Sequence, residues 1–328
     1  MHIPDNYLSP ETCAVMTAVM VPVWAVSVKK AGKDIPAEKI PMLGVGAAFS
    51  FLSMMFNIPL PGGTTGHAVG GTLLAVALGP WEACISVSTA LLLQALLFGD
   101  GGILSFGANC FNMAFVLPFT GYAAAKFIKR HLKNENREVI GAAAGSYIGL
   151  NAAALCAAVE FGIQPLLFRD AAGNALYCPY GLSISVPAML AGNLTLFGLA
   201  EIVFTEAVLI FVKKASPEFL VKDKSRTRTG PALKALLGAL MILTPAGLLA
   251  EGCAWGEWDL SGGALPGGTA LTAGLRRGFS FSAMLPDYSL AGVPEWFGYI
   301  LSAVIGVAVL IIVFKLFSIS GRKEKAAA

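Results

Sequence analysis

One of the three histidines in this 328-residue chain is its second residue. A histidine at position two offers one metal ion three adjacent nitrogens: the terminal amine of Met1, the backbone amide of His2 and the His2 ring. Together they close a five-membered and a six-membered chelate ring. A deprotonated amide is a strong in-plane donor and favours the tetragonal geometry of Ni(II) and Cu(II). His2 is therefore a candidate metal ligand, and the alternative is an ordinary surface histidine near the start of a chain.

His67 is the candidate for the remaining planar position. It lies in a stretch, residues 57–71, that contains two prolines and five glycines, so the backbone there is expected to be irregular. Irregular backbone at membrane depth is tolerated only where protein or a water-filled cavity satisfies its polar groups, and an ionisable residue there is a functional candidate. The alternative is a histidine that caps the short helix after it. His131, between Arg130 and Lys133, is interpreted as a solvated charge.

Four further residues are candidates for the surroundings of the ion. Thr65 and Gly66 directly precede His67. Asn109 and Asn112 are three positions apart, so they share one face of a helix. The two amides could hydrogen-bond a metal-bound histidine, or they could equally hold helices together in lipid.

Two acidic residues near these segments have open roles. Asp100 begins an Asp-Gly-Gly turn that is expected on the outer side and could line the same cavity. Glu201 lies deep in a predicted span, where it either contacts a partner subunit or makes an internal hydrogen bond. The sequence does not decide between these roles.

Membrane helices must position all of these residues. The chain is 56% hydrophobic and only 13% charged, whereas an ordinary soluble chain carries about a quarter charged residues. Spans of about 20 apolar residues match the thickness of a bilayer. The sequence predicts an all-α, polytopic integral membrane protein with about nine spans, of which the third is short and glycine-rich. They cover residues 8–28, 40–57, 67–79, 82–98, 108–128, 138–160, 186–212, 232–250 and 296–316.

The basic residues predict the orientation of the chain. With the N-terminus outside and the C-terminus inside, 20 of the 23 Lys and Arg residues fall in cytoplasmic segments, as the positive-inside rule requires. No basic residue precedes the first span, while Lys29 and Lys30 follow it, which is the reverse of a secretory signal. The first span is therefore expected to stay in the mature protein, with Ser9 as its N-cap and Pro10 at the first helical position.

The predicted organisation is a seven-span unit followed by a two-span unit. Residues 1–214 form the first, residues 215–230 form a cytoplasmic linker, and residues 231–328 form the second, with an external loop at 251–295. Six cysteines show no zinc-like spacing and are interpreted as small apolar fillers, although Cys178 and Cys253 could pair on the outer side.

Three motifs, in order, resemble a known family. The opening Met1-His2-Ile3-Pro4-Asp5, the run from Thr65 to Gly71 and the run from Gly107 to Met113 are similar to the substrate-binding M component of nickel and cobalt energy-coupling factor (ECF) transporters, the CbiM/NikM family. The resemblance covers residues 1–214. Residues 231–328 are similar, more weakly, to the small N component of these systems or to a PDGLE-like extension. The family usually has glycine where this chain has Asn6, a residue type that also tolerates left-handed backbone.

The resemblance implies a metal site and a set of partners. Met1, His2 and His67 would hold Co(II) or Ni(II), the transported substrate, in a plane of four nitrogens. A transmembrane coupling (T) subunit and cytoplasmic ATPase (A) subunits would supply energy, together with a separate N component if residues 231–328 do not replace it. The chain itself has no G-x-x-x-x-G-K-[ST] loop, so no bound nucleotide is expected. The expected location is the plasma membrane of a prokaryote, with lipid but no nucleic acid as a partner.

The alternative function is a secondary transporter or channel for a small polar solute. Such a protein needs ionisable residues within its spans, and apart from Glu201 and Glu160 the spans offer few. An enzyme is not expected, because no clustered acid–base pair and no nucleophile beside a base is visible. The choice between nickel and cobalt stays open at this point.

Overall fold

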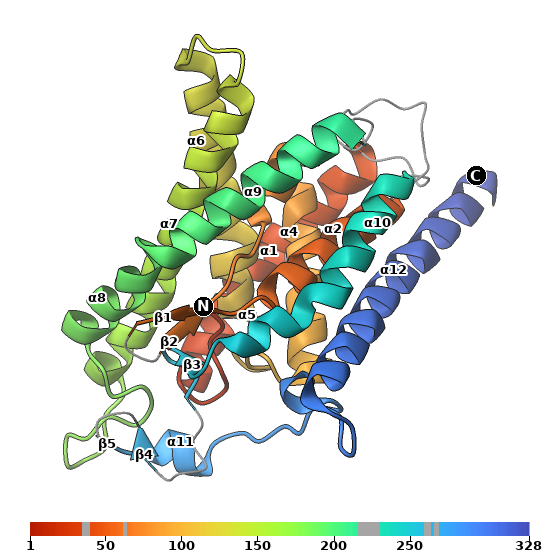
Figure 1. The fold of residues 1–328 in the computed structure, drawn as a ribbon. Coiled ribbons are helices and arrows are strands. Elements are labelled where there is room, and N and C mark those ends of the chain that lie inside the picture. Colours follow the sequence, from red (N-terminus) through yellow and green to blue (C-terminus); the bar gives the residue numbers. More distant parts are fainter. Residues whose placement is uncertain (35–39, 62–63, 216–229, 259–263, 266–268, 328) are drawn as a thin grey trace.

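The protein is a bundle of long apolar helices, with short strands and an extended connection at one end (Figure 1). The computed structural model describes residues 1–34, 40–61, 64–215, 230–258, 264–265 and 269–327. The prediction of an all-α membrane protein is confirmed. In chain order the helices are α1 (Pro10–Asp34), α2 (Ile40–Met54), α3 (Gly71–Ala77), α4 (Pro80–Leu93), α5 (Phe106–Asn109), α6 (Leu117–His131), α7 (Arg137–Leu167), α8 (Leu182–Asn193), α9 (Leu196–Ala215), α10 (Pro231–Leu243), α11 (Ala273–Arg277) and α12 (Glu295–Ala327).

Six helical segments among the described residues are long and apolar enough to cross a bilayer, and each coincides with a predicted span. They are Pro10–Gly32, Pro80–Phe98, Arg137–Leu167, Leu182–Ala215, Pro231–Leu249 and Glu295–Ile319. The other three predicted spans have other forms. The second is the 15-residue helix α2, the third contains only the seven-residue helix α3, and the fifth consists of α5, a π-helical stretch and α6. Nine full crossings therefore stay a prediction.

The seventh predicted span, 186–212, is two helices rather than one. Helix α8 ends at Asn193 and α9 begins at Leu196. The Asn193 amide donates to the carbonyl of Met189 at 2.8 Å, and the Thr195 hydroxyl donates to the carbonyl of Ala191 at 2.6 Å. Side chains that bond the preceding turn in this way compete with the helix backbone, which accounts for the break.

The strands form two small sheets at the end of the bundle opposite the α6–α7 connection. Strands β1 (Ile58–Leu60) and β2 (Thr64–Gly66) pair antiparallel, and β3 (Cys253–Ala254) pairs parallel to β2. Strands β4 (Ala264–Leu265) and β5 (Thr269–Ala270) form the second sheet. The chain that follows α10 therefore adds a strand to the hairpin that leads to His67.

The ends of the bundle differ in the segments that they carry. Figure 1 shows the α6–α7 connection, the end of α9, the start of α10 and the C-terminus at one end, and β4, β5 and α11 at the other. The segments of the first group are those predicted to be cytoplasmic from their basic residues. The inside–outside orientation itself remains a prediction, and the predicted linker lies almost wholly outside the described residues.

Small residues bring α6 and α7 into close contact. A Cβ atom added at Gly145 would lie 2.4 Å from the Gly121 carbonyl oxygen, and one added at Gly149 would lie 2.5 Å from the Leu117 carbonyl oxygen. Only glycine permits backbones to approach so closely, which is a common way for helices to associate in lipid.

Helix α12 packs against α2, so the C-terminal helices contact the rest of the bundle directly. A Cβ atom at Gly44 would touch Phe314, and one at Gly306 would lie 2.4 Å from the Phe51 ring. The Tyr299 hydroxyl donates to the Met55 carbonyl at 3.0 Å. These contacts fix the helix that follows the predicted external loop beside the segment that leads to β1.

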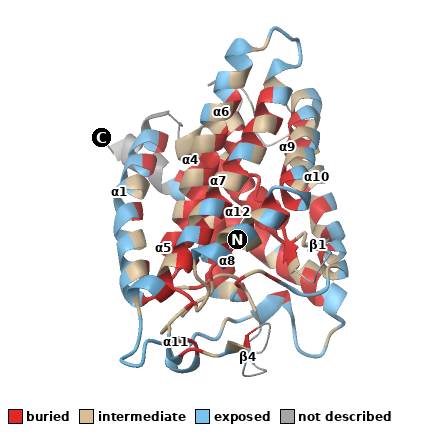
Figure 2. Ribbon diagram, turned by 90° about the vertical axis from the view of Figure 1, so that its left-hand side faces the viewer, coloured by how far each residue is buried: buried red, intermediate tan, exposed pale blue. Residues whose placement is uncertain are grey.

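Burial is concentrated along the middle of the bundle, and the loop that carries α11 is largely exposed (Figure 2). Helix α1 presents exposed valines such as Val15, Val19 and Val28 on its outer side, as expected for a helix that faces lipid. The Thr12 backbone N–H donates to Ser9 Oγ at 3.0 Å, which confirms Ser9 as the N-cap of α1. All six cysteines are free, so Cys178 and Cys253 form no disulfide in this structure.

Candidate metal centre

The first residues of the chain are buried inside the bundle. Met1, His2 and Ile3 are exposed by only 7%, 2% and 0%. Hydrogen bonds to the Ile3 backbone hold this segment against α5 and the loop before it. The Ile3 N–H donates to Asn109 Oδ1 at 2.7 Å, the Asn109 amide donates back to the Ile3 carbonyl at 3.1 Å, and the Gly102 N–H donates to the same carbonyl at 2.9 Å. Asn109 therefore fixes the backbone beside His2.

The turn after Asp5 has two anchors. The Asp5 carboxylate accepts the backbone N–H groups of Ile103 at 3.1 Å and Leu104 at 2.8 Å. Asn6 has a φ of 70°, in the left-handed region that asparagine tolerates better than most residues. Its side-chain amide also exchanges two 2.8 Å hydrogen bonds with the backbone of Phe279. Asparagine at this position is therefore compatible with the turn.

His2 and His67 lie side by side. Their ring centroids are 5.0 Å apart, and His67 is exposed by only 6%. The Nε2 atoms of both rings are buried and have no hydrogen-bond partner among the described residues. Burial lowers the pKa of His2 to about 4. The His2 ring is therefore neutral at physiological pH, the form in which imidazole binds metals.

The backbone on either side of His67 is fixed by α9. Gly66 packs against Phe197, where an added Cβ would lie 2.6 Å from the ring. The Glu201 carboxylate accepts the Val69 N–H at 2.7 Å and the Gly70 N–H at 3.1 Å. Glu201 thus makes an internal hydrogen bond, one of the two roles left open by the sequence, and this bond holds the segment directly after His67.

Two carboxylates complete the surroundings of the N-terminus. The Met1 amine lies 3.2 Å from Glu257 Oε1, and His2 Nδ1 lies 3.0 Å from Asp100 Oδ1. The potential ligand atoms of His2, Asp100 and Glu257 all lie within 4.8 Å of one another. Glu257 was not anticipated from the sequence, because it lies in a loop more than 250 residues away and belongs to no recognisable motif.

An aromatic cluster positions the loop that carries Glu257. The Trp258 ring lies tilted beside Tyr7, with ring centroids 6.0 Å apart, and the Trp255 and Phe161 ring centroids are 5.5 Å apart in an edge-to-face arrangement. Gly256 between these tryptophans has a φ of 89°, and an added Cβ would lie 2.7 Å from the Phe161 ring. The conformation that places Glu257 beside the N-terminus therefore requires glycine at 256.

The remaining predicted residues have separate locations. Thr65, in β2, lines a small cavity together with Met1 and His67. Asn112 donates to Glu160 Oε2 at 2.8 Å, whereas Asn109 contacts the backbone of Ile3. The two asparagines therefore have different partners, although they are three residues apart.

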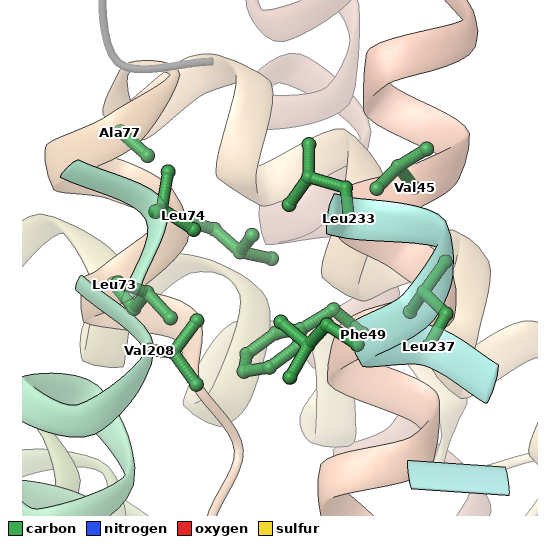
Figure 3. Close-up of a pocket in the computed structure, with 10 residues that line it drawn as sticks. Val45, Phe49, Leu73, Leu74, Ala77, Val208, Leu233 and Leu237 are labelled. Carbon is green, nitrogen blue, oxygen red and sulfur yellow. The ribbon is translucent and has the colours of Figure 1, made fainter. Parts of the chain in front are cut away.

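A second cavity lies elsewhere in the bundle and is wholly apolar. It is lined by residues of α2, α3, α9 and α10, including Val45, Phe49, Leu73, Val208 and Leu237 (Figure 3). Because none of its lining side chains can ligate a metal, this cavity does not compete with the N-terminal site as a metal centre.

Comparison with known proteins gives family matches over most of the chain. Residues 2–219 match the CbiM family, described as the cobalt uptake substrate-specific transmembrane region, and residues 230–322 match the PDGLE domain. Several relatives match nearly end to end, two of them at 48% identity. The probable fused nickel transport protein LarMN of Lactiplantibacillus plantarum is 48% identical over 96% of this chain and 97% of its own length. The fused nickel transport protein NikMN of Rhodobacter capsulatus is 48% identical over 95% of each chain.

Solved structures agree with these matches. A crystal structure described as a truncated transition metal transporter is 53% identical to this chain, with a TM-score of 0.62, and covers 65% of this chain and 99% of its own length. The fold and the family matches point to a membrane transport protein rather than to an enzyme. The chain therefore belongs to the CbiM family of cobalt-uptake substrate-specific transmembrane proteins, joined to a PDGLE domain, and is a multi-pass membrane protein of a prokaryote.

Proposed function

We propose that this protein is the substrate-capture component of an ATP-driven, ECF-type importer of nickel or cobalt. In this proposal the Met1 amine, the His2 amide, the His2 ring and the His67 ring hold the ion in a plane of four nitrogens. The observation that carries the proposal is the burial of the first two residues beside His67, with ring centroids 5.0 Å apart and an unpartnered Nε2 on the His67 ring. Buried polar atoms are normally satisfied, so this nitrogen is available to a ligand held beside the N-terminus.

Loading of the planar site would replace one contact seen in the structure. The six-membered chelate ring closes through His2 Nδ1, and this atom lies 3.0 Å from Asp100 Oδ1. A ring nitrogen that ligates a metal cannot also donate a hydrogen bond, so chelation would end the hydrogen bond to Asp100.

Nickel is the preferred substrate in this proposal, with cobalt second. Four nitrogens in a plane suit Ni(II) better than Co(II). The relatives that match nearly the whole chain are named as nickel transport proteins, whereas the CbiM proteins named for cobalt match about 40% of it. Competition titrations with the two ions measure the preference directly.

The energy for transport comes from other subunits in this proposal. The chain has no phosphate-binding loop of the P-loop type. A transmembrane coupling subunit and cytoplasmic ATPases would therefore drive release toward the cytoplasm. The residues after 230, which match the PDGLE domain, would stand in place of a separate N component.

The alternative of a secondary transporter or channel needs ionisable coupling residues within the spans, and its candidates were Glu160 and Glu201. Both carboxylates have internal partners that give them a structural role: Asn112 for Glu160, and the Val69 and Gly70 N–H groups for Glu201. Transport by the purified chain alone, reconstituted without ATPase subunits, would restore this alternative.

Addition of one residue before Met1 tests the proposed chelate. The extension moves the terminal amine out of the five-membered ring, so calorimetric titration with Ni²⁺ is expected to show loss of tight binding. His67→Ala is expected to weaken binding as well, while His131→Ala, at an exposed histidine in α6, serves as the matched control. Unchanged Ni²⁺ affinity in the extended chain would contradict the proposal.

A further inference from the structure

His2, Asp100 and Glu257 form a cluster of donors that the four-nitrogen plane does not use. Their potential ligand atoms lie within 4.8 Å of one another. The donor set is one imidazole and two carboxylates, which differs in chemistry from an all-nitrogen plane. Such a mixed set suits a divalent cation that retains part of its water shell.

The carboxylates lie nearer to solvent than the nitrogens. The side chains of Asp100 and Glu257 are 19% and 22% exposed, whereas those of Met1 and His2 are 4% and 2% exposed. A cation that approaches from this side meets the oxygen donors first.

Asp100 is held in position for this contact. Its Oδ2 atom accepts hydrogen bonds from Gln94 Nε2, at 3.1 Å, and from the Tyr288 hydroxyl. These bonds leave Oδ1 directed at His2 Nδ1, 3.0 Å away. A carboxylate oriented by its second oxygen is typical of metal ligands.

The third donor of the cluster is a buried imidazole. The His2 side chain is 2% exposed, and its Nδ1 atom lies 3.0 Å from Asp100 Oδ1. The His2 nitrogen belongs with the carboxylate oxygens of Asp100 and Glu257 to one group of potential ligand atoms. A nitrogen and an oxygen at this separation can be neighbouring ligands of one cation.

We propose that His2, Asp100 and Glu257 form an entry site, which receives a partly hydrated divalent cation before the ion moves to the four-nitrogen plane. This inference rests on the proposed function for its final destination. Both sites use the His2 Nδ1 atom, so they cannot be filled at once. Transfer of the ion to the plane exchanges the two carboxylates for the Met1 amine, the His2 amide and the His67 ring.

Binding of Mn²⁺ to the full-length protein tests the entry site separately from the plane. Mn²⁺ prefers carboxylate, imidazole and water to planar nitrogen, and its electron paramagnetic resonance signal reports binding. The wild type and His67→Ala are expected to bind Mn²⁺ equally. Glu257→Gln and Asp100→Asn are expected to weaken binding on the order of tenfold, because each removes a charge that concentrates cations. Glu251→Gln, an exposed acid of the same loop, is the control.

Loading kinetics give a second readout. In the wild type Mn²⁺ should slow the appearance of the absorbance of planar Ni²⁺, and Glu257→Gln should remove that competition. In the isolated protein, bound Ni²⁺ returns to solvent through the entry site, so Glu257→Gln should slow both its association and its dissociation. A merely structural role for Glu257 would lower the Ni²⁺ affinity without changing the association rate.

The outcomes separate the two proposals. Absence of Mn²⁺ binding in the wild type, or wild-type Mn²⁺ affinity in Glu257→Gln, overturns the entry site and leaves the planar site standing. Unchanged Ni²⁺ affinity in the N-terminally extended chain overturns the planar site, whatever the Mn²⁺ result. Preserved helix content and melting temperature in Glu257→Gln establish that the variant is folded.

Discussion

The side-chain amide of Asn109 bonds both backbone groups of Ile3: its Oδ1 accepts the Ile3 N–H at 2.7 Å, and its Nδ2 donates to the Ile3 carbonyl at 3.1 Å. The two hydrogen bonds have the pattern of one residue pair in a β-sheet, with the Asn109 side chain in place of the neighbouring strand. It fixes the peptide directly after His2 in a region 0–3% exposed, where a free N–H group would be costly. The position of the His2 chelating atoms thus depends on a residue more than 100 positions away in the chain.

Asn109→Ala is expected to weaken Ni²⁺ binding without preventing folding. The substitution leaves the buried Ile3 N–H without its acceptor, which costs about 1–3 kcal/mol and loosens the segment that carries the chelating atoms. Calorimetric titration should show a loss of roughly tenfold or more, since about 1.4 kcal/mol corresponds to a factor of ten. Asn151→Ala, in α7, is the control, because the Asn151 amide donates to the Tyr147 carbonyl of its own helix. Equal affinity in Asn109→Ala and wild type would remove Asn109 from the site.

Glu201→Gln is expected to lower both stability and metal affinity. In the wild type the Val69 and Gly70 N–H groups both donate to the Glu201 carboxylate. Hydrogen bonds to charged groups are worth about 1.5–3 kcal/mol each. An amide can present only one oxygen to these donors, so His67 should lose its fixed position. Thermal unfolding and Ni²⁺ titration measure the two effects. Glu206→Gln, five residues further along α9, should leave both unchanged; a similar loss in both variants would indicate a general effect of charge in this helix.

Gly66→Ala is expected to disturb His67 by steric conflict. The added Cβ would lie 2.6 Å from Phe197, and overpacking of this kind costs about 1–3 kcal/mol. Ni²⁺ affinity and melting temperature should both fall, and Phe197→Leu in the same chain should recover part of each by making room. Gly181→Ala is the matched control, because nothing lies within 4 Å of a Cβ at that position. A neutral Gly66→Ala would show that this contact does not position His67.

Much of the fold was predictable because it depends on local pattern. Apolar runs located the helices, and the prolines and glycines of residues 57–71 indicated the irregular segment at His67–Gly70 before α3. The break between α8 and α9 was not predicted, since both sides of it are apolar and the cause is a pair of side-chain hydrogen bonds. Periodicity carries no information about such bonds.

The candidate site was predictable only in part. A histidine at position two has the spacing of a chelate with the terminal amine, so the sequence indicated Met1 and His2. The proline- and glycine-rich stretch around His67 indicated that residue. Glu257 has no such signal: its place beside the Met1 amine results from strand β3, which pairs with β2, and from the Trp255–Trp258 cluster. Contacts between segments this far apart in the chain follow from packing, which no local pattern of residues specifies.

X-ray absorption spectroscopy of the Ni²⁺-loaded, full-length protein tests the central claim most directly. The account predicts four nitrogen ligands in a plane, with imidazole scattering from two rings, and loss of one imidazole contribution in His67→Ala. A six-coordinate nickel with oxygen ligands in the fully loaded wild type, or a spectrum unchanged in His67→Ala, would contradict it.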